Sequence, residues 1–234
     1  MDFKTVHEQV HDVPFIDDEN ARFLYDLIVK EGLRDILELG IAHGTATCYM
    51  AAAVDELGTG TVTSVDLLEM ADHFQPSPEE QLASLGLAEH VNIVRTQTGY
   101  TWFLHDDIAR NSKGKTCRPI YDLVIIDGPK NWTIDGAAFF MAEKLLRPGG
   151  WLIFDDLRWT YGRADKRRRS TDGIAHRSLS DDERNVPHIA EIFNLLVKQH
   201  PNFDTFFVHH DDWAVARKVQ TTERRGWLRR WRSR

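Results

Sequence analysis

The chain alternates short apolar runs, rich in β-branched residues, with longer segments in which apolar residues recur at helical spacing. Five runs are typical of buried strands, at residues 35–40, 61–67, 91–95, 121–128 and 151–156. Helices are predicted at residues 20–33, 44–58, 77–87, 98–110, 133–146 and 186–200. Strands and helices in this alternation form a doubly wound α/β fold with right-handed crossovers. Two further strands, 202–210 and 211–219, can pair antiparallel, so we expect a mostly parallel seven-stranded sheet with a C-terminal antiparallel strand.

The composition is that of an ordinary globular protein and favours one domain. With 234 residues, 42% hydrophobic and 28% charged, the chain can bury a single large core. We expect one domain over residues 1–219, followed by a basic tail at 220–234 that carries tryptophan and arginine. Only two cysteines occur, no apolar run approaches the ~20 residues of a membrane span, and the N-terminus lacks signal-peptide features. A cytoplasmic location is therefore expected.

Two basic segments stand apart from the strand–helix pattern. The loop at 158–185 carries six Lys or Arg residues within 158–169. A loop of this length is usually functional or disordered, so it is either a mobile lid over a substrate or a solvated loop that neutralises the acidic body. The tail suits an anionic membrane surface or nucleic-acid phosphates and bases. Alternatively, it is a solubilising extension or folds back on the acidic body. The net charge of −7 gives no reason to expect a nucleic-acid partner for the domain.

The first predicted strand ends in a turn that contains Gly40 and Gly44. Glycines at these places let the backbone turn sharply and approach a ligand, and the following helix directs free N–H groups toward it. The turn is not a dinucleotide fingerprint, because Ala42 stands where the second glycine would be, and no Gly-Lys-Ser/Thr of a Walker loop follows. Ligands of open α/β sheets bind at the carboxyl ends of the strands, so this turn is a candidate binding site.

This turn and the acid that ends the second strand resemble the class I S-adenosylmethionine (SAM)-dependent methyltransferases. An acid-x-Gly-x-x-x-Gly motif runs from Glu38 to Gly44, Asp66 ends the second strand, and YDLVIIDG and LLRPGGWLIFDD follow downstream. The resemblance implies the Rossmann-like methyltransferase fold and SAM as cofactor, with Asp66 accepting hydrogen bonds from the ribose hydroxyls. The cofactor-binding residues that it implies are Glu38, Gly40, Ala42, Gly44, Thr45, Asp66, Leu67, Thr98, Gly99 and Asp127. The alternative is an unrelated nucleotide-binding α/β domain.

Three carboxylates follow the fourth and fifth predicted strands, on Asp127, Asp155 and Asp156. Neighbouring strands of a sheet lie ~5 Å apart, so these groups would repel one another unless a cation joins them. Mg²⁺ prefers oxygen ligands, which makes the three acids a candidate metal site. Alternatively, one acid caps a helix and another pairs with the arginine-rich loop.

These acids and a nearby lysine resemble the Mg²⁺-dependent branch of the family that includes catechol O-methyltransferase and bacterial natural-product and sugar O-methyltransferases. An Asp-x-x-Lys motif joins Asp127 to Lys130, and Asp155 and Asp156 follow further along the chain. The resemblance implies that Asp127, Asp155 and Asp156 hold the metal, and that Asp127 and Lys130 serve catalysis, Lys130 as the base. Alternatively, Lys130 only pairs with Asp127. A histidine that often follows the Asp-Gly in this branch is replaced here by Pro129 and Lys130.

The expected function is a SAM-dependent O-methyltransferase that acts, with divalent-metal assistance, on a hydroxyl of a small molecule such as a natural product, a sugar or a catechol-like diol. The basic loop favours an anionic acceptor, and Trp132, Trp159 and Tyr161 are candidates for the wall of the acceptor site. Two alternatives are a metal-dependent, hydroxylase-like relative on the same fold and a noncatalytic SAM-binding protein. The run His209 to Asp212 contains metal-ligand residue types, but we predict a turn at a strand end.

Overall fold

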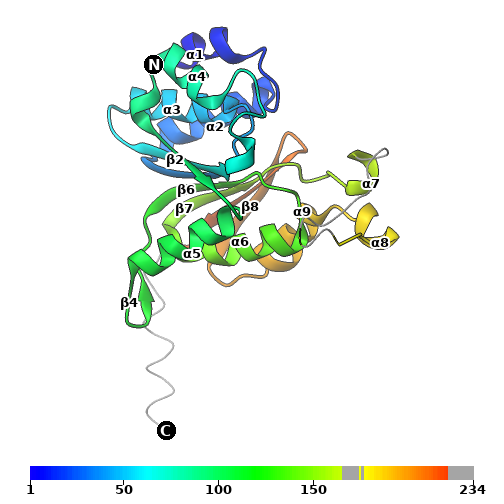
Figure 1. Cartoon of the computed structure of the whole chain (residues 1–234). Coiled ribbons are helices and arrows are strands. Elements are labelled where there is room, and N and C mark those ends of the chain that lie inside the picture. Colours follow the sequence, from blue (N-terminus) through cyan, green and yellow to red (C-terminus); the bar gives the residue numbers. More distant parts are fainter. Residues whose placement is uncertain (165–173, 175–176, 221–234) are drawn as a thin grey trace, which may run out of the picture.

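The computed structural model describes residues 1–164, 174 and 177–220, and its centre is a seven-stranded sheet in the order β3-β2-β1-β6-β7-β9-β8 (Figure 1). The strands are β1 Asp35–Leu39, β2 Thr61–Leu67, β3 Val91–Thr96, β6 Tyr121–Ile126, β7 Leu146–Phe154, β8 Phe203–His209 and β9 Trp213–Lys218. Pairing is parallel from β3 to β7, whereas β9 runs antiparallel to both β7 and β8. The predicted doubly wound sheet with a C-terminal antiparallel strand is confirmed.

Helices cover both faces of this sheet (Figure 1). One face carries α1 Phe3–Val10, α2 Asp18–Glu31, α3 Thr45–Glu56 and α4 Pro78–Leu85, and the other carries α5 Tyr100–Asn111, α6 Trp132–Leu145, α9 His188–Glu191 and η3 Ile192–Val197. Smaller elements are η1 Leu68–Met70, η2 Ala88–His90, the hairpin β4 Ser112–Lys113 and β5 Thr116–Cys117, α7 Tyr161–Ala164 and α8 Asp181–Asn185. Each helical layer buries its apolar stripe against the sheet, which gives two hydrophobic clusters, one on each side.

Local sequence signals account for most of the helix ends. Ser77 and Glu80 form a capping box at the start of α4, and Gly86 ends that helix in the left-handed conformation. The Asp17 side chain caps α2, and the Asn131 side chain caps α6 by accepting from two N–H groups of its first turn. The turn from β6 into α6, which contains the candidate base, is therefore held at its far end by a cap.

Several features differ from the sequence-based prediction. Helix α1 and the β4–β5 hairpin were not expected, and the loop expected over 158–185 contains the short helices α7 and α8. Strand β7 begins at Leu146 rather than Trp151, because Leu146, expected as the last residue of the preceding helix, pairs with Tyr121 of β6. The helix expected over 186–200 begins at His188, after Pro187, and continues as the wider turns of η3. For β7, pairing with a distant strand outweighs the local pattern.

Strand order reverses at β1, which lies between β2 and β6. The carboxyl ends of β1, β2, β6 and β7 therefore meet at one edge, where ligands bind in open sheets. None of the described helices is both long enough and apolar enough to cross a bilayer. Residues 165–173, 175–176 and 221–234 lie outside the described chain, so the lid proposed for 158–185 and the role of the tail stay predictions.

Candidate functional site

The turn after β1 contains three residues in the left-handed region: Gly40 (φ +104°), Ala42 (φ +50°) and Gly44 (φ +80°). A Cβ on Gly40 would lie 2.0 Å from the carbonyl oxygen of Asp127, and one on Gly44 would lie 2.7 Å from the Cβ of Pro78. No described side chain caps the α3 helix that follows, so its first N–H groups remain available at the turn. The turn therefore requires glycine at both places and packs directly against the end of β6.

Asp66 lies at the end of β2 and faces this turn. Its Oδ2 accepts hydrogen bonds from the N–H groups of Ile41 (3.0 Å) and Ala42 (3.3 Å), and its Oδ1 accepts one from the N–H of Leu67 (2.7 Å). The carboxylate thus joins the ends of β1 and β2 and stands beside the glycine turn, as predicted. Its contact with a ribose stays a prediction.

The other predicted cofactor residues surround the same strand ends. Thr45 begins α3 and donates from its hydroxyl to the carbonyl of Pro14 (3.1 Å). Thr98 and Gly99 occupy the turn between β3 and α5, where a Cβ on Gly99 (φ +94°) would lie 4.0 Å from Cδ2 of Leu67. The structure therefore brings the predicted residues of β1, β2 and β3 to one edge of the sheet.

Glu38 lies on β1 with only 2% of its surface exposed, and its carboxylate accepts a hydrogen bond from the Thr47 hydroxyl (2.6 Å). Burial raises the pKa of Glu38 to about 7, and the charge of Asp66 adds to the shift. A carboxyl group that titrates near neutral pH thus lies under the glycine turn.

This buried carboxyl makes stability depend on pH in a defined direction. In the unfolded chain Glu38 ionises near its usual pKa of 4.5, whereas the folded state holds the proton until about pH 7. Between these values the folded state binds more protons, so stability falls as pH rises, by about 3 kcal/mol in total. We expect Glu38→Gln to remove this part of the pH dependence in urea unfolding at pH 4.5 to 8. The control is Glu79→Gln, which changes a side chain that is 51% exposed. Identical plots of stability against pH for Glu38→Gln and wild type would contradict the raised pKa of Glu38.

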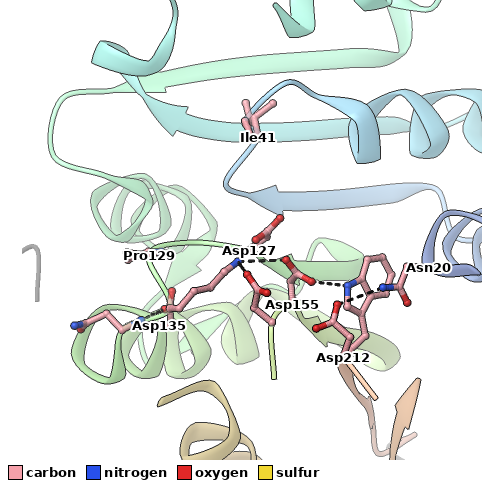
Figure 2. A network of polar contacts seen from close by, with 12 residues as sticks. Asn20, Ile41, Asp127, Pro129, Asp135, Asp155 and Asp212 are labelled. Carbon is pink, nitrogen blue, oxygen red and sulfur yellow. Dashed lines mark hydrogen bonds and ion pairs between the residues drawn. The ribbon is translucent and has the colours of Figure 1, made fainter. Parts of the chain in front are cut away.

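The three acids after β6 and β7 gather as predicted. One carboxylate oxygen from each of Asp127, Asp155 and Asp156 lies within 4.8 Å of the others, so together they could hold a metal ion. The ammonium group of Lys130 is placed among them: it pairs with Asp127 and lies 3.3 Å from Asp155 and 3.2 Å from Asp156. Figure 2 shows Asp127 and Asp155 turned toward one another, with the hydrogen bonds that join them to their neighbours.

The charges of this cluster determine the protonation state of Lys130. Burial by itself lowers the pKa of the ammonium group, but the carboxylates of Asp127, Asp155 and Asp156 outweigh burial and raise the pKa above its ordinary value. Lys130 is therefore protonated in this arrangement. The simple pairing of Lys130 with Asp127 that the sequence left open extends to all three acids.

A set of buried contacts that sequence reasoning missed holds the turn from Asp127 to Asn131. Asp135 is fully buried in α6; it accepts a hydrogen bond from the Asn131 N–H (2.6 Å) and a short one from the Tyr100 hydroxyl. A Cβ on Gly128 would lie 2.0 Å from that hydroxyl. The turn is thus tied to both α5 and α6.

The turn between β8 and β9 brings a fourth acid to the cluster. As predicted, the residues from His209 to Asp212 form a turn at a strand end, but Asp212 lies beside Asp155 (Figure 2). Burial and the charges of Asp155 and Asp156 raise the pKa of Asp212 to about 6, and Asn20 of α2 donates to its Oδ2 (3.4 Å). The residue after it, Trp213, donates from its indole N–H to Asp155 (2.6 Å). No local signal in the sequence identifies this contact.

The aromatic residues predicted for the acceptor wall lie in the segments that follow β6 and β7. Trp159 and Tyr161 follow β7 and make an edge-to-face contact with ring centroids 4.6 Å apart. The Tyr161 hydroxyl donates to the carbonyl of Pro129 (3.0 Å), and Trp132 begins α6 with 39% of its surface exposed. His43 lies in the glycine turn with its Nδ1 3.0 Å from the carbonyl oxygen of Pro76.

Comparison with known proteins agrees with this geometry. The profile of the methyltransferase domain family matches residues 37–157, just over half of the chain. A search of curated proteins gave no match.

Three solved structures illustrate the structural likeness. A putative caffeoyl-CoA O-methyltransferase from Staphylococcus aureus has a TM-score of 0.62 and 21% identity, with 92% of this chain and 91% of that one covered. An O-methyltransferase from Bacillus cereus, solved in complex with S-adenosylhomocysteine (SAH), has a TM-score of 0.61 and 20% identity, with 92% of this chain and 87% of that one covered. An O-methyltransferase of tomaymycin synthesis from Streptomyces achromogenes, solved with SAM, has a TM-score of 0.58 and 18% identity, with 92% of this chain and 86% of that one covered. At these identities the likeness establishes the fold.

Proposed function

The chain belongs to the methyltransferase domain family, and from that premise we propose that it is a SAM-dependent O-methyltransferase for a hydroxyl of a small molecule, acting with divalent-metal assistance. One observation carries the proposal: the glycine turn packs against the strand end that bears the acid cluster. Gly40 approaches the backbone of Asp127 so closely that no side chain fits between them. A cofactor held by the turn and an acceptor held at the acids would therefore meet at one edge of the sheet.

The residues around the glycine turn suit SAM. When bound, SAM supplies a methyl group already activated by its sulfonium. Gly40 and Gly44 allow the backbone to come close to the ligand, and the N–H groups at the start of α3 offer donors to its carboxylate. Asp66, at the end of β2, offers acceptor oxygens to the ribose hydroxyls. The chain's own task is to orient the two reactants so that the acceptor oxygen lies in line with the methyl group.

The acid cluster suits a hard divalent cation, since Asp127, Asp155 and Asp156 offer three converging carboxylate oxygens. When bound there, such an ion would act as a Lewis acid that lowers the pKa of an acceptor hydroxyl. Trp213 orients Asp155 through its indole N–H, and the buried contacts of Asp135 orient the turn that carries Lys130. Trp132, at the start of α6, and Trp159, after β7, remain our candidates for the wall that receives a small planar or hydroxylated acceptor.

Binding of the cofactor is the first test, and Asp66 is the residue to change. We expect Asp66→Ala to weaken SAM and SAH binding by about 5- to 150-fold, because hydrogen bonds to a charged partner contribute about 1–3 kcal/mol. Calorimetric titration of wild type and variant measures the difference. Asp72→Ala, which removes an exposed acid in the loop after η1, is the control and should bind as wild type. Equal affinities of Asp66→Ala and wild type would contradict the pocket assignment.

Methyl transfer itself is tested with radiolabelled SAM and a panel of catechols, polyols and cell extracts. We expect label to pass to a small molecule whose mass rises by about 14 units, the net gain when a methyl group replaces a proton. SAM binding without transfer to any acceptor would favour a noncatalytic binding protein. Absence of binding by both SAM and SAH would refute the proposed function.

A further inference from the structure

Lys130 places a positive charge where an ion bound by the three acids would have to lie. Its ammonium nitrogen pairs with Asp127 and is 3.3 Å from Asp155 and 3.2 Å from Asp156. The carboxylate oxygens of the same three residues converge within 4.8 Å of one another. An ammonium nitrogen that contacts all three acids fills the centre of the group. A divalent ion and this ammonium group therefore compete for one position.

The backbone and its surroundings direct Lys130 into the cluster. Its φ of +59° is in the left-handed region, which side-chain-bearing residues seldom adopt unless the surrounding structure holds them there. The neighbouring residues provide that hold: Tyr161 donates to the carbonyl of Pro129, and the N–H of Asn131 donates to the buried Asp135. The side chain is buried as well. Lys130 is thus held in the cluster by the fold.

Charge balance explains why an internal cation is needed. Asp127, Asp155 and Asp156 bring three carboxylates together, and Asp212 adds a fourth beside Asp155. Without a cation these groups repel one another, and the chain could fold only by keeping some of them protonated. Lys130 supplies one positive charge that is always present. A divalent ion would supply two, but it would also repel an ammonium group left within a few ångström.

We propose that Lys130 is the resident cation of this acid cluster, and that a divalent metal ion binds there only by displacing its ammonium group. The importance of this competition for catalysis rests on the proposed function. The competition itself can be measured without methyl transfer. The fold is then stable without metal, and metal affinity is set by the cost of moving Lys130 out of the cluster.

The test is metal binding to the full chain, with Mn²⁺ as the probe. We expect Lys130→Met to bind Mn²⁺ at least about 10-fold more tightly than wild type in calorimetric titration, because no ammonium group has to be displaced. The matched control is Lys218→Met, which also removes a buried lysine. Lys218 pairs with Glu143 (2.9 Å) at the far end of β9, so its loss should leave Mn²⁺ affinity unchanged.

Thermal unfolding provides a second readout that does not depend on affinity fitting. In chelator, Lys130→Met should melt below wild type, and Mn²⁺ should raise its melting temperature more than that of wild type at the same concentration. If Lys130→Met does not fold in chelator, recovery of the fold on addition of Mn²⁺ supports the proposal. Failure of both Lys130→Met and Lys130→Gln to fold with Mn²⁺ present would overturn it.

Equal Mn²⁺ affinity in wild type and Lys130→Met would overturn the competition, and so would absence of Mn²⁺ binding by both proteins. SAH titration of the wild type separates these outcomes from failure of the proposed function. If the wild type binds neither SAH nor SAM, the proposed function is refuted, and the Mn²⁺ titrations still decide the competition by themselves. Intact SAH binding with equal Mn²⁺ affinities would refute the competition alone.

Discussion

Replacement of Asp155 by alanine is expected to lower methyl transfer by about 1,000-fold while SAH affinity changes by no more than about threefold. Asp155 is central to the acid cluster: it lies 3.3 Å from the Lys130 ammonium group and accepts the Trp213 indole N–H at 2.6 Å. Its removal takes away a proposed metal ligand and the carboxylate that joins Lys130 to Trp213. The cofactor turn is built from other residues and should stay intact. Single-turnover rates with an acceptor found in the radiolabel screen, beside SAH titration, measure both effects.

The control for Asp155→Ala is Asp211→Ala. Asp211 lies in the β8–β9 turn with 78% of its side chain exposed and pairs with Arg158 at the surface, so this variant changes the net charge equally. It should methylate as wild type. Full activity of Asp155→Ala, or undiminished wild-type activity in EDTA, would contradict metal binding by Asp155 and Asp156 and indicate another role for them.

Gly40→Ala is expected to cost about 4 kcal/mol of stability and to abolish measurable SAM binding. A Cβ at this position would lie 2.0 Å from the carbonyl oxygen of Asp127, which is backbone and cannot rotate away, and the φ of +104° is itself unfavourable for alanine. Relief of the clash would push the end of β1 away from β6. Urea unfolding and SAM titration measure the two losses.

Gly86→Ala is a matched control for this substitution. Gly86 also adopts a left-handed conformation (φ +69°), but a Cβ there would meet no atom within 4 Å. Its replacement should cost only about 1 kcal/mol and leave SAM binding unchanged, because strain is present without a clash. A similar loss for both variants would mean that the approach of the glycine turn to β6 is not what requires Gly40.

The strand ends and their polar residues were predictable from the sequence. Strand and helix periodicity, with glycines and caps at the boundaries, act over a few neighbouring residues and survive in the sequence as local signals. Glu38, Gly40 and Asp66 could therefore be placed at one edge of a sheet before any contact was known. The same logic placed Asp127 and Asp155 together, because neighbouring strands of a parallel sheet end at the same edge.

The partners of these residues were decided by tertiary structure. Asn20 and Asp212 are separated by 192 positions in the chain, and Tyr100 and Asp135 by 35. Such pairs leave no local pattern, since which side chains meet depends on how helices and strands pack rather than on their own periodicity. Lys130 shows the difference most clearly. The family resemblance implied that Lys130 is a base, and its closeness to Asp127 in the sequence left a simple ion pair open. Only the convergence of β6 and β7, with the turn held by Asp135, gives its ammonium group three carboxylate partners at once.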